Sequence, residues 1–455
     1  MLFRSRARTL AMKAALLSEN GDNAGARQTL KEALKAPGGD KPRLLSELGE
    51  TNLRLGDNAA AVTAFGQAVD AGAGADIQSA LAEALVRDGK PEQALGVYRK
   101  LAETAETPER RNAARLATAN LLVRLGQHAE AAEIFLSLAK SGQPGMLLKA
   151  GQSFLAARQD GKAIAAFEAS ASMAGSQSAK AEALIALGNV YAGRREAKKA
   201  YATFTQASRL AADLPRDKQA DIALGRGTAA MLAGEPAKAV EPFTQALRLV
   251  DDGSRKARAL MSLGQAYGTL GDAKNAAEAW KRAAAMPGAL RTDVASAEEN
   301  LGYILSAAGD LAGAEKAFRS ALTASGPNWR LLAALGQVAF KAGRYQDALD
   351  DFTRSLALHP DVTTRIALGR SYEKLGKPGL ALYAFAKAAP EVDALPPAQR
   401  REFYLARGFL YAEEFRYDAA AAAFKTAQAL GYDPETATRL GRLERLSGHA
   451  KEAWA

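Results

Sequence analysis

One short pattern recurs along the whole chain. In its clearest copy the order is Leu335, Gly336, Gly343, Ala348 and Phe352. Small residues recur at the position of Gly336, at intervals of 32 to 39 residues. They are Ala14, Gly49, Ala82, Ala119, Gly151, Gly188, Gly227, Gly264, Gly302, Gly336, Gly369, Gly408 and Gly441. A chain built in this way folds unit by unit, because each unit packs on its neighbours instead of around one central core.

Each copy is expected to form two helices joined by a tight turn. In the clearest copy they span about 330–342 and 345–357, and Gly343 supplies the positive φ that ends the first helix. Gly336 is expected to be small because the two antiparallel helices approach closely, whereas Phe352 should fill the space between one unit and the next. No alternating pattern typical of strands competes with this interpretation.

The repeat resembles the tetratricopeptide repeat, whose period is near 34 residues, over essentially the whole chain. The resemblance implies an all-α fold, a right-handed superhelical solenoid of antiparallel helix pairs. We expect one continuous array over 1–455, with a hinge near 389–400, where three prolines gather. The last copy begins at Gly441 and stops at Ala455, so we expect the final repeat to be truncated and the natural protein to continue.

Composition excludes several kinds of chemistry. The chain has no cysteine and three histidines, so it has no disulfide framework, thiolate zinc site or thiol nucleophile. His128, His359 and His449 lie near predicted turns, far apart in sequence. Residues 225–230 match a dinucleotide-binding pattern, but they fall inside a predicted helix and not between a strand and a helix. We therefore predict a protein that is not an enzyme and has no catalytic, cofactor or metal site.

The net charge of +10 comes from 60 basic and 50 acidic residues. It permits attraction to a polyanion or an anionic surface, but so mild an excess is also typical of ordinary surface charge. Nucleic-acid binding is disfavoured, because aromatic residues such as Tyr98, Phe204 and Trp280 occupy core positions of the repeat and not stacking positions. No apolar run reaches the length of a membrane span, and Lys13 interrupts the only segment that begins like a signal peptide.

The resemblance also predicts where a partner binds. In the family a concave groove is lined by first-helix positions one and five residues after the small residue and three residues before it. The first two positions here carry amide, hydroxyl and basic groups. The predicted groove residues are Asn120, Gln152, Asn189, Gln265, Tyr303, Gln337, Arg370, Arg124, Lys341 and Lys374. Amides both donate and accept hydrogen bonds, which suits the backbone of an extended peptide or the hydroxyls of a glycan. Three residues before the small residue no basic side chain occurs, which argues against a chaperone-tail adaptor.

These patterns predict a non-enzymatic protein–protein interaction scaffold that binds an extended partner segment. Long arrays of this composition resemble bacterial periplasmic scaffolds of exopolysaccharide secretion, which slightly favours the cell envelope. Two alternatives remain open at this point. In the first, the basic groove binds an anionic polysaccharide or other polyanion directly. In the second, the chain is the non-catalytic arm of a larger protein.

Overall fold

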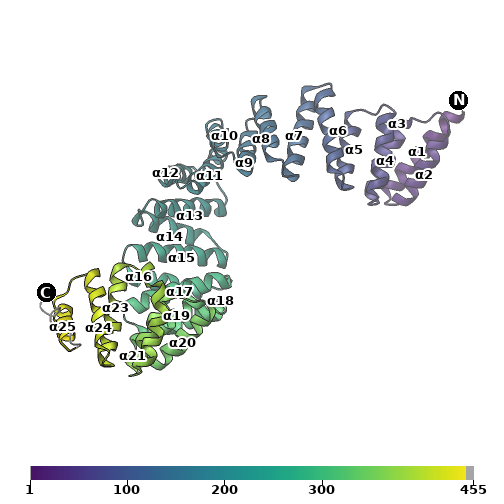
Figure 1. Cartoon of the computed structure of the whole chain (residues 1–455). Coiled ribbons are helices and arrows are strands. Elements are labelled where there is room, and N and C mark those ends of the chain that lie inside the picture. Colours follow the sequence, from purple (N-terminus) through teal and green to yellow (C-terminus); the bar gives the residue numbers. More distant parts are fainter. Residues whose placement is uncertain (1, 447–455) are drawn as a thin grey trace. The chain divides into compact units, whose positions relative to one another are not determined.

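A computed structural model of the chain describes residues 2–446, and every regular element in that range is a helix (Figure 1). The chain divides into two compact units, Met1–Leu214 and Pro215–Ala455, called here the N-terminal and C-terminal units. Within each unit the helices form antiparallel pairs, and odd-numbered helices are the first of each pair. The predicted all-α fold of helix pairs is therefore confirmed.

The N-terminal unit contains six helix pairs. Its helices are α1 (Leu2–Glu19), α2 (Asn23–Lys35), α3 (Lys41–Arg54), α4 (Asn58–Asp70), α5 (Ala75–Arg87), α6 (Pro91–Thr104), α7 (Pro108–Arg124), α8 (His128–Lys140), α9 (Met146–Ala156), α10 (Asp160–Ser172), α11 (Gln177–Gly193) and α12 (Ala197–Arg209).

The C-terminal unit continues the same alternation. Its helices are α13 (Arg216–Leu232), α14 (Ala237–Leu249), α15 (Gly253–Thr269), α16 (Ala273–Ala284), α17 (Arg291–Ala307), α18 (Leu311–Ser325), α19 (Trp329–Lys341), α20 (Tyr345–Leu358), α21 (Val362–Lys374), α22 (Pro378–Ala388), the 3₁₀ helix η1 (Ala389–Ala394), α23 (Pro397–Glu413), α24 (Tyr417–Leu430) and α25 (Pro434–Leu446).

Local chemistry sets the turn inside each pair. Between α17 and α18, Gly309 has a φ of 85°, which glycine adopts without steric cost. The next residue, Asp310, accepts a hydrogen bond from the backbone N–H of Gly313 at 2.9 Å and so caps α18. Between α19 and α20, Gly343 likewise adopts a positive φ, of 75°, as the sequence predicts.

Where the small residue of a first helix is one of nine glycines, it lies under an aromatic ring of its own pair. A Cβ on Gly336 would lie 2.6 Å from Cδ1 of Phe352, which is fully buried. Phe352 also packs against Ala367 in the next pair. Our expectation that Phe352 fills only the space between units is therefore incomplete, because the ring first occupies the space that the glycine leaves. The same arrangement is found at Gly49, Gly151, Gly188, Gly227, Gly264, Gly302, Gly369 and Gly408.

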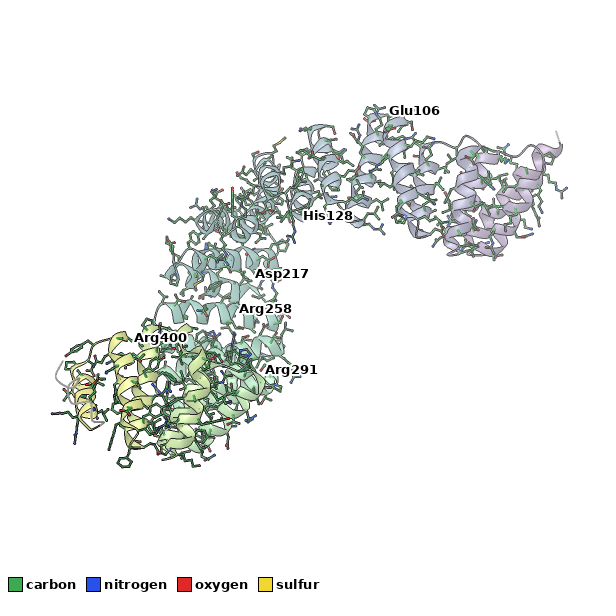
Figure 2. The ribbon with its side chains drawn as sticks, in the orientation of Figure 1. Glu106, His128, Asp217, Arg258, Arg291 and Arg400 are labelled. Carbon is green, nitrogen blue, oxygen red and sulfur yellow. The ribbon has the colours of Figure 1, made fainter. Side chains whose placement is uncertain are left out.

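Ion pairs join successive helix pairs. On the first helices of the C-terminal unit, Arg255 binds Asp217 and Asp221, with N–O distances of 2.9 and 2.5 Å. Arg258 binds Asp293 in the next pair at 3.3 Å; Figure 2 labels Asp217 and Arg258. These contacts link neighbouring repeats in addition to the apolar packing between them.

The joints between pairs differ in how they are packed. The boundary between the two units falls in the non-helical residues 210–215. The predicted hinge, 389–400, lies inside the C-terminal unit, where η1 places Val392 in one cluster with Phe385 and Phe403. The hinge and the continuous solenoid over 1–455 stay predictions, and most of the final repeat lies outside the described residues.

Candidate functional site

The first helices form the inner face of each unit. Successive first helices contact one another, as α9 and α11 do in the N-terminal unit and α13, α15 and α17 do in the C-terminal unit. Contacts between successive second helices are weaker. Helices that stand closer on one side curve the stack toward that side, so a partner groove is expected on the first helices.

Two hollows open on this face of the N-terminal unit, and Asn120 of α7 lines both. One, of about 400 Å³, lies between α5 and α7 and is lined by Arg87, Tyr98 and Arg124 among others. The second, of about 260 Å³, lies between α7 and α9 and includes Gln152. The structure therefore brings together three of the predicted groove residues, Asn120, Arg124 and Gln152.

The hollow between α5 and α7 carries more positive than negative charge. Arg87 and Arg124 line it together with Glu83, and within the described residues neither arginine side chain forms an ion pair. Burial raises the pKa of Tyr98, and the charge of Glu83 adds to the shift. A neutral phenol, an amide and two guanidinium groups can hold a carboxylate or a backbone carbonyl.

Two more hollows lie on the first helices of the C-terminal unit. The larger, of about 390 Å³, is formed by α17, α19 and the start of α21 and includes Tyr303 and Lys341. The smaller, of about 270 Å³, is formed by α19, α21 and α23 and includes Arg370. Gln337 and Thr363 line both hollows, so the two are continuous across α19 and α21.

Aromatic rings form one wall of the larger hollow. The Tyr303 ring lies edge-on to Phe318, with centroids 5.0 Å apart, and the residue remains 48% exposed. Burial of its hydroxyl raises the pKa of Tyr303, so the phenol stays protonated and can donate a hydrogen bond at neutral pH. Trp329 stacks on His359 at 4.6 Å and stands beside the same hollow.

The predicted cations differ in how they are paired. Lys341 contacts only the hydroxyl of Ser306, with a 3.4 Å distance from Nζ to Oγ. Arg370 instead forms an ion pair with Glu402 of α23, at 3.0 Å. The basic character predicted for this end of the groove is therefore partly neutralised.

The remaining predicted residues lie outside these hollows. Asn189 of α11 and Gln265 of α15 are exposed on first helices, and Lys374 is exposed at the end of α21. The Gln265 side chain approaches the Thr269 hydroxyl one turn later, at 3.5 Å. Their role in a groove stays a prediction.

Sequence reasoning missed several residues that line the hollows. Trp329, Arg330 and Thr363 lie in the first turns of α19 and α21, and Gln399 and Glu402 lie in the first half of α23. They fall outside the three positions in each repeat that the family resemblance picks out. The one available signal was the run of polar and aromatic residues that opens each of these helices.

A family model described as tetratricopeptide repeat matches well over half of the chain. The matched segments are residues 12–76, 79–145, 224–289, 261–329 and 333–398. The chain belongs to the tetratricopeptide repeat family. Two pairs between the matched segments keep the same packing, since Gly151 lies under Phe167 and Gly188 under Phe204.

Solved structures show the same kind of fold. A C-terminal part of a tetratricopeptide protein from Cytophaga hutchinsonii is 16% identical, covers 55% of this chain and 97% of its own, and has a TM-score of 0.48. A tetratricopeptide protein from Parabacteroides merdae is 19% identical, with 58% and 98% covered and a TM-score of 0.39. The MamA protein is 20% identical, with 38% and 92% covered and a TM-score of 0.35. No curated protein matches the chain.

Other chemistry is scarce in this tetratricopeptide array. Within the described residues, no three acidic or histidine side chains gather as a metal site. The same residues include no helix with the length and apolarity needed to cross a membrane. His128, labelled in Figure 2, begins α8 and lines the hollow between α7 and α9, whereas His449 lies outside the described residues.

Proposed function

We propose that the chain is a scaffold whose first-helix faces bind an extended segment of a partner protein. The tetratricopeptide fold is typical of protein–protein interaction scaffolds. One observation carries the proposal: in each unit two hollows follow one another across consecutive first helices, with an exposed amide, Asn120 or Gln337, between them.

This arrangement suits a peptide more than a compact ligand. Side chains on one side of an extended segment enter successive hollows, while an amide between the hollows pairs with the segment's backbone N–H and C=O groups. Because each hollow is open and small, affinity comes from a few anchor side chains held at the right spacing. The proposed partner is therefore a flexible or terminal segment of another protein.

A matched set of substitutions tests the proposal. The groove variant is Asn120→Ala/Gln152→Ala/Gln337→Ala, which removes exposed amides that line the hollows, and the control is Gln67→Ala/Gln93→Ala/Gln346→Ala, which removes exposed amides from second helices. In co-precipitation from the native host, a discrete protein should be lost with the groove variant and kept with the control. Equal recovery with both variants would contradict groove binding.

A second candidate function is direct binding of an anionic polysaccharide or another polyanion. It is favoured by Arg87 and Arg124, which line one hollow and form no ion pair with any described residue. Such binding falls steeply with salt, because it depends on release of counterions. Washing the same co-precipitation at low and high salt separates the two, since a peptide held by apolar anchors stays bound at high salt.

The proposed setting is a bacterial cell-envelope assembly for exopolysaccharide secretion, in which this array is the non-catalytic arm of a complex or of a larger protein. It is supported by the length of the array and its alanine- and arginine-rich composition. Fractionation of the native host with an antibody to the chain tests it. Recovery with the cytoplasmic fraction alone would contradict the setting.

A further inference from the structure

The larger hollow of the C-terminal unit has an apolar wall and floor. Tyr303 is held edge-on against the buried Phe318, so half of its ring faces solvent in a fixed orientation. Ala333 and Ala334 of α19 contribute methyl groups to the same hollow. A large apolar side chain that enters here loses contact with water on several sides at once, which is the setting of a binding hot spot.

One cation at this hollow has no carboxylate partner among the described residues. Within residues 2–446 the one polar contact of the Lys341 ammonium is with the Ser306 hydroxyl. Asp361 also lines the hollow, but its carboxylate already accepts hydrogen bonds from the hydroxyls of Thr363 and Thr364 at 2.5 and 2.7 Å. A carboxylate brought by a partner would therefore find a donor at Lys341 that no acidic group of the chain occupies.

At the opposite end of the hollow, the charged and aromatic side chains already contact one another. Arg330 lies over the Trp329 ring, 5.2 Å from its centroid, and His359 stacks on the same ring. Glu299 and Arg330 both lie near enough to Tyr303 to shift its pKa, in opposite directions. Arg330 and His359 already contact the indole, which leaves less of the ring for stacking on a sugar or a base. Because the carboxylate of Asp361 lines the same hollow, a single carboxylate suits the hollow better than a polyanion.

The smaller hollow has a mixed lining in which the charges balance. Phe340, Ile366 and Ala367 form an apolar patch, and Arg370 and Glu402, which form an ion pair, line the hollow beside uncharged polar side chains. The apolar patch can take an uncharged apolar side chain. Packed helices stand roughly 8–10 Å apart, and an extended segment in the polyproline II conformation advances about 3.1 Å per residue with about three residues per turn. Side chains about three positions apart therefore lie on one side of such a segment and can enter the two hollows.

We propose that the C-terminal unit recognises an extended protein segment with three features. These are a large apolar or aromatic residue that enters the hollow beside Tyr303, an adjacent Asp or Glu that pairs with Lys341, and a second apolar residue about three positions away that enters the hollow beside Phe340. The inference rests on the proposed groove function and adds the chemistry of its partner.

Synthetic peptides test this motif directly. The probe is a fluorescein-labelled 12-residue peptide with a Gly/Ser/Ala background, one Phe-Glu pair, and a Leu three positions after the Phe. Its matched peptides carry Gln for Glu, Ala for Phe, or the Leu moved to six positions. Affinity is measured by fluorescence anisotropy with the full chain, its Lys341→Gln and Tyr303→Ala variants, and the control Lys316→Gln, which changes an exposed lysine of the second helix α18 outside both hollows.

The motif predicts a specific pattern of affinities. Replacing Glu by Gln in the peptide should weaken binding to the unchanged protein and to Lys316→Gln by about tenfold, and should have no effect on binding to Lys341→Gln. Lys341 is exposed, so its substitution leaves the fold intact. Replacing the Phe by Ala in the peptide should also weaken binding to the unchanged protein by about tenfold. The same replacement should have no effect on binding to Tyr303→Ala.

Several results would overturn the inference. Peptide binding that is indifferent to Glu, Phe or spacing, or that responds equally to Lys341→Gln and Lys316→Gln, contradicts the motif but leaves groove binding standing. Absence of peptide binding at about 1 mM, together with salt-sensitive binding of alginate, contradicts both the motif and the peptide function. Dependence of the co-precipitated partner on Asn120, Gln152 and Gln337 reports on the proposed function alone.

Discussion

At the scale of single residues, the fold depends on pairs of a small residue and an aromatic ring. Gly336 lacks a Cβ at the place where Phe352 lies, and the same relation recurs through both units. Where the repeat carries alanine instead, as at Ala119, that residue is equally buried. The size of this one residue therefore sets how closely the two helices of a pair approach.

Substitution of Gly336 by alanine is expected to destabilise the protein. The new Cβ would lie 2.6 Å from the buried Phe352 ring, and such overpacking costs about 1–3 kcal/mol, which outweighs a gain of about 1 kcal/mol in helix propensity. Gly96→Ala is the control, because that helical glycine has nothing within 4 Å of an added Cβ. Urea unfolding should show Gly336→Ala less stable and Gly96→Ala more stable than the unchanged protein. A stabilised Gly336→Ala would contradict the packing.

Three turns carry a side chain where the other turns carry glycine. Arg158, Arg195 and Phe415 have φ values of 58°, 60° and 57°, in the left-handed region that costs about 1–2 kcal/mol for most residues. Arg195→Gly should therefore raise the free energy of unfolding by about 1 kcal/mol. Arg195→Ala removes the same side chain but keeps the unfavourable φ, so thermal unfolding should show no gain for it. Equal gains for both variants would show that the side chain, and not the backbone, causes the strain.

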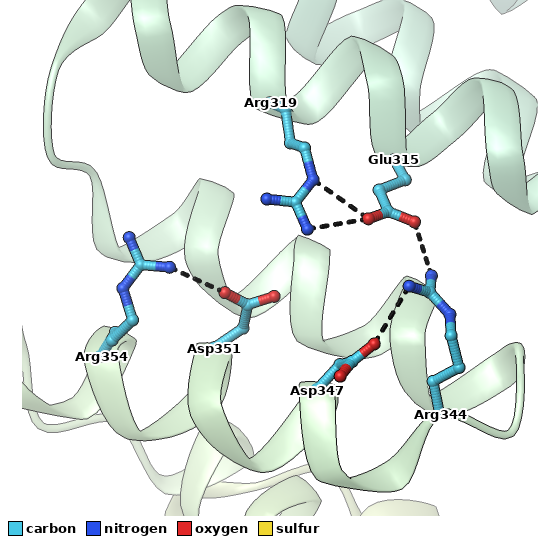
Figure 3. A network of polar contacts seen from close by, with 6 residues as sticks. All are labelled: Glu315, Arg319, Arg344, Asp347, Asp351 and Arg354. Carbon is cyan, nitrogen blue, oxygen red and sulfur yellow. Dashed lines mark hydrogen bonds and ion pairs between the residues drawn. The ribbon is translucent and has the colours of Figure 1, made fainter.

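At the scale of helices, charged networks bind one pair to the next. Figure 3 shows Glu315 of α18 between Arg319 of its own helix and Arg344 at the start of α20, at 2.8 and 2.5 Å. Arg344 continues to Asp347, and Asp351 pairs with Arg354. Glu315 thus connects two successive second helices, whose backbones contact each other less than those of successive first helices do.

The pH dependence of this network follows from opposite pKa shifts. Hydrogen bonds from Arg344 and Arg319 lower the pKa of Glu315, so its stabilisation is present above the unfolded-state pKa of about 4.3 and is lost as pH falls through the lower folded value. Glu315→Gln should lower the free energy of unfolding by about 1 kcal/mol at pH 7. Urea unfolding should show this difference shrinking as pH falls below about 4. A difference that persists in acid would contradict the ionic origin.

Asp351 in the same network should behave in the opposite way. Burial disfavours its charged form and raises its pKa despite the nearby Arg354, so the folded state loses stability as pH rises from the unfolded-state pKa to the folded one. Asp351→Asn should therefore leave stability at pH 7 unchanged or higher in the same urea experiment. A loss equal to that of Glu315→Gln would show that the Arg354 pair outweighs burial.

At the scale of the whole molecule, the array consists of two compact units whose boundary falls at residues 210–215. Limited digestion with subtilisin should cut first in these six non-helical residues. Residues 389–396 should be protected, because η1 holds Val392 fully buried. Mass spectrometry of the first fragments distinguishes the two sites. A first cut within 389–396 would instead support a hinge at that position.

The repeat could be predicted well because small and aromatic residues recur at fixed positions of each helix pair. The equivalents of Gly336 and Phe352 mark most helix pairs. Counting from these positions also identifies Asn120 and Gln337 as exposed first-helix residues. The hollows could be predicted only in part. Trp329 and Thr363 lie in the first turns of their helices. Along the chain, the number of residues between such a first turn and the small residue of the repeat varies with the length of the first helix. The Arg370–Glu402 pair joins residues 32 positions apart, and its geometry depends on how successive first helices pack.

The central claim is that partners bind on the first-helix face. The most direct measurement is site-specific photo-crosslinking in the native host, with a benzophenone amino acid at Gln337 and, in a matched chain, at Gln346 on the second helix α20. Both side chains are exposed glutamines, so the two probes differ only in the face on which they lie. We predict one discrete protein adduct at Gln337 and none at Gln346. The same adduct at both positions, or an adduct at Gln346 alone, would contradict the account.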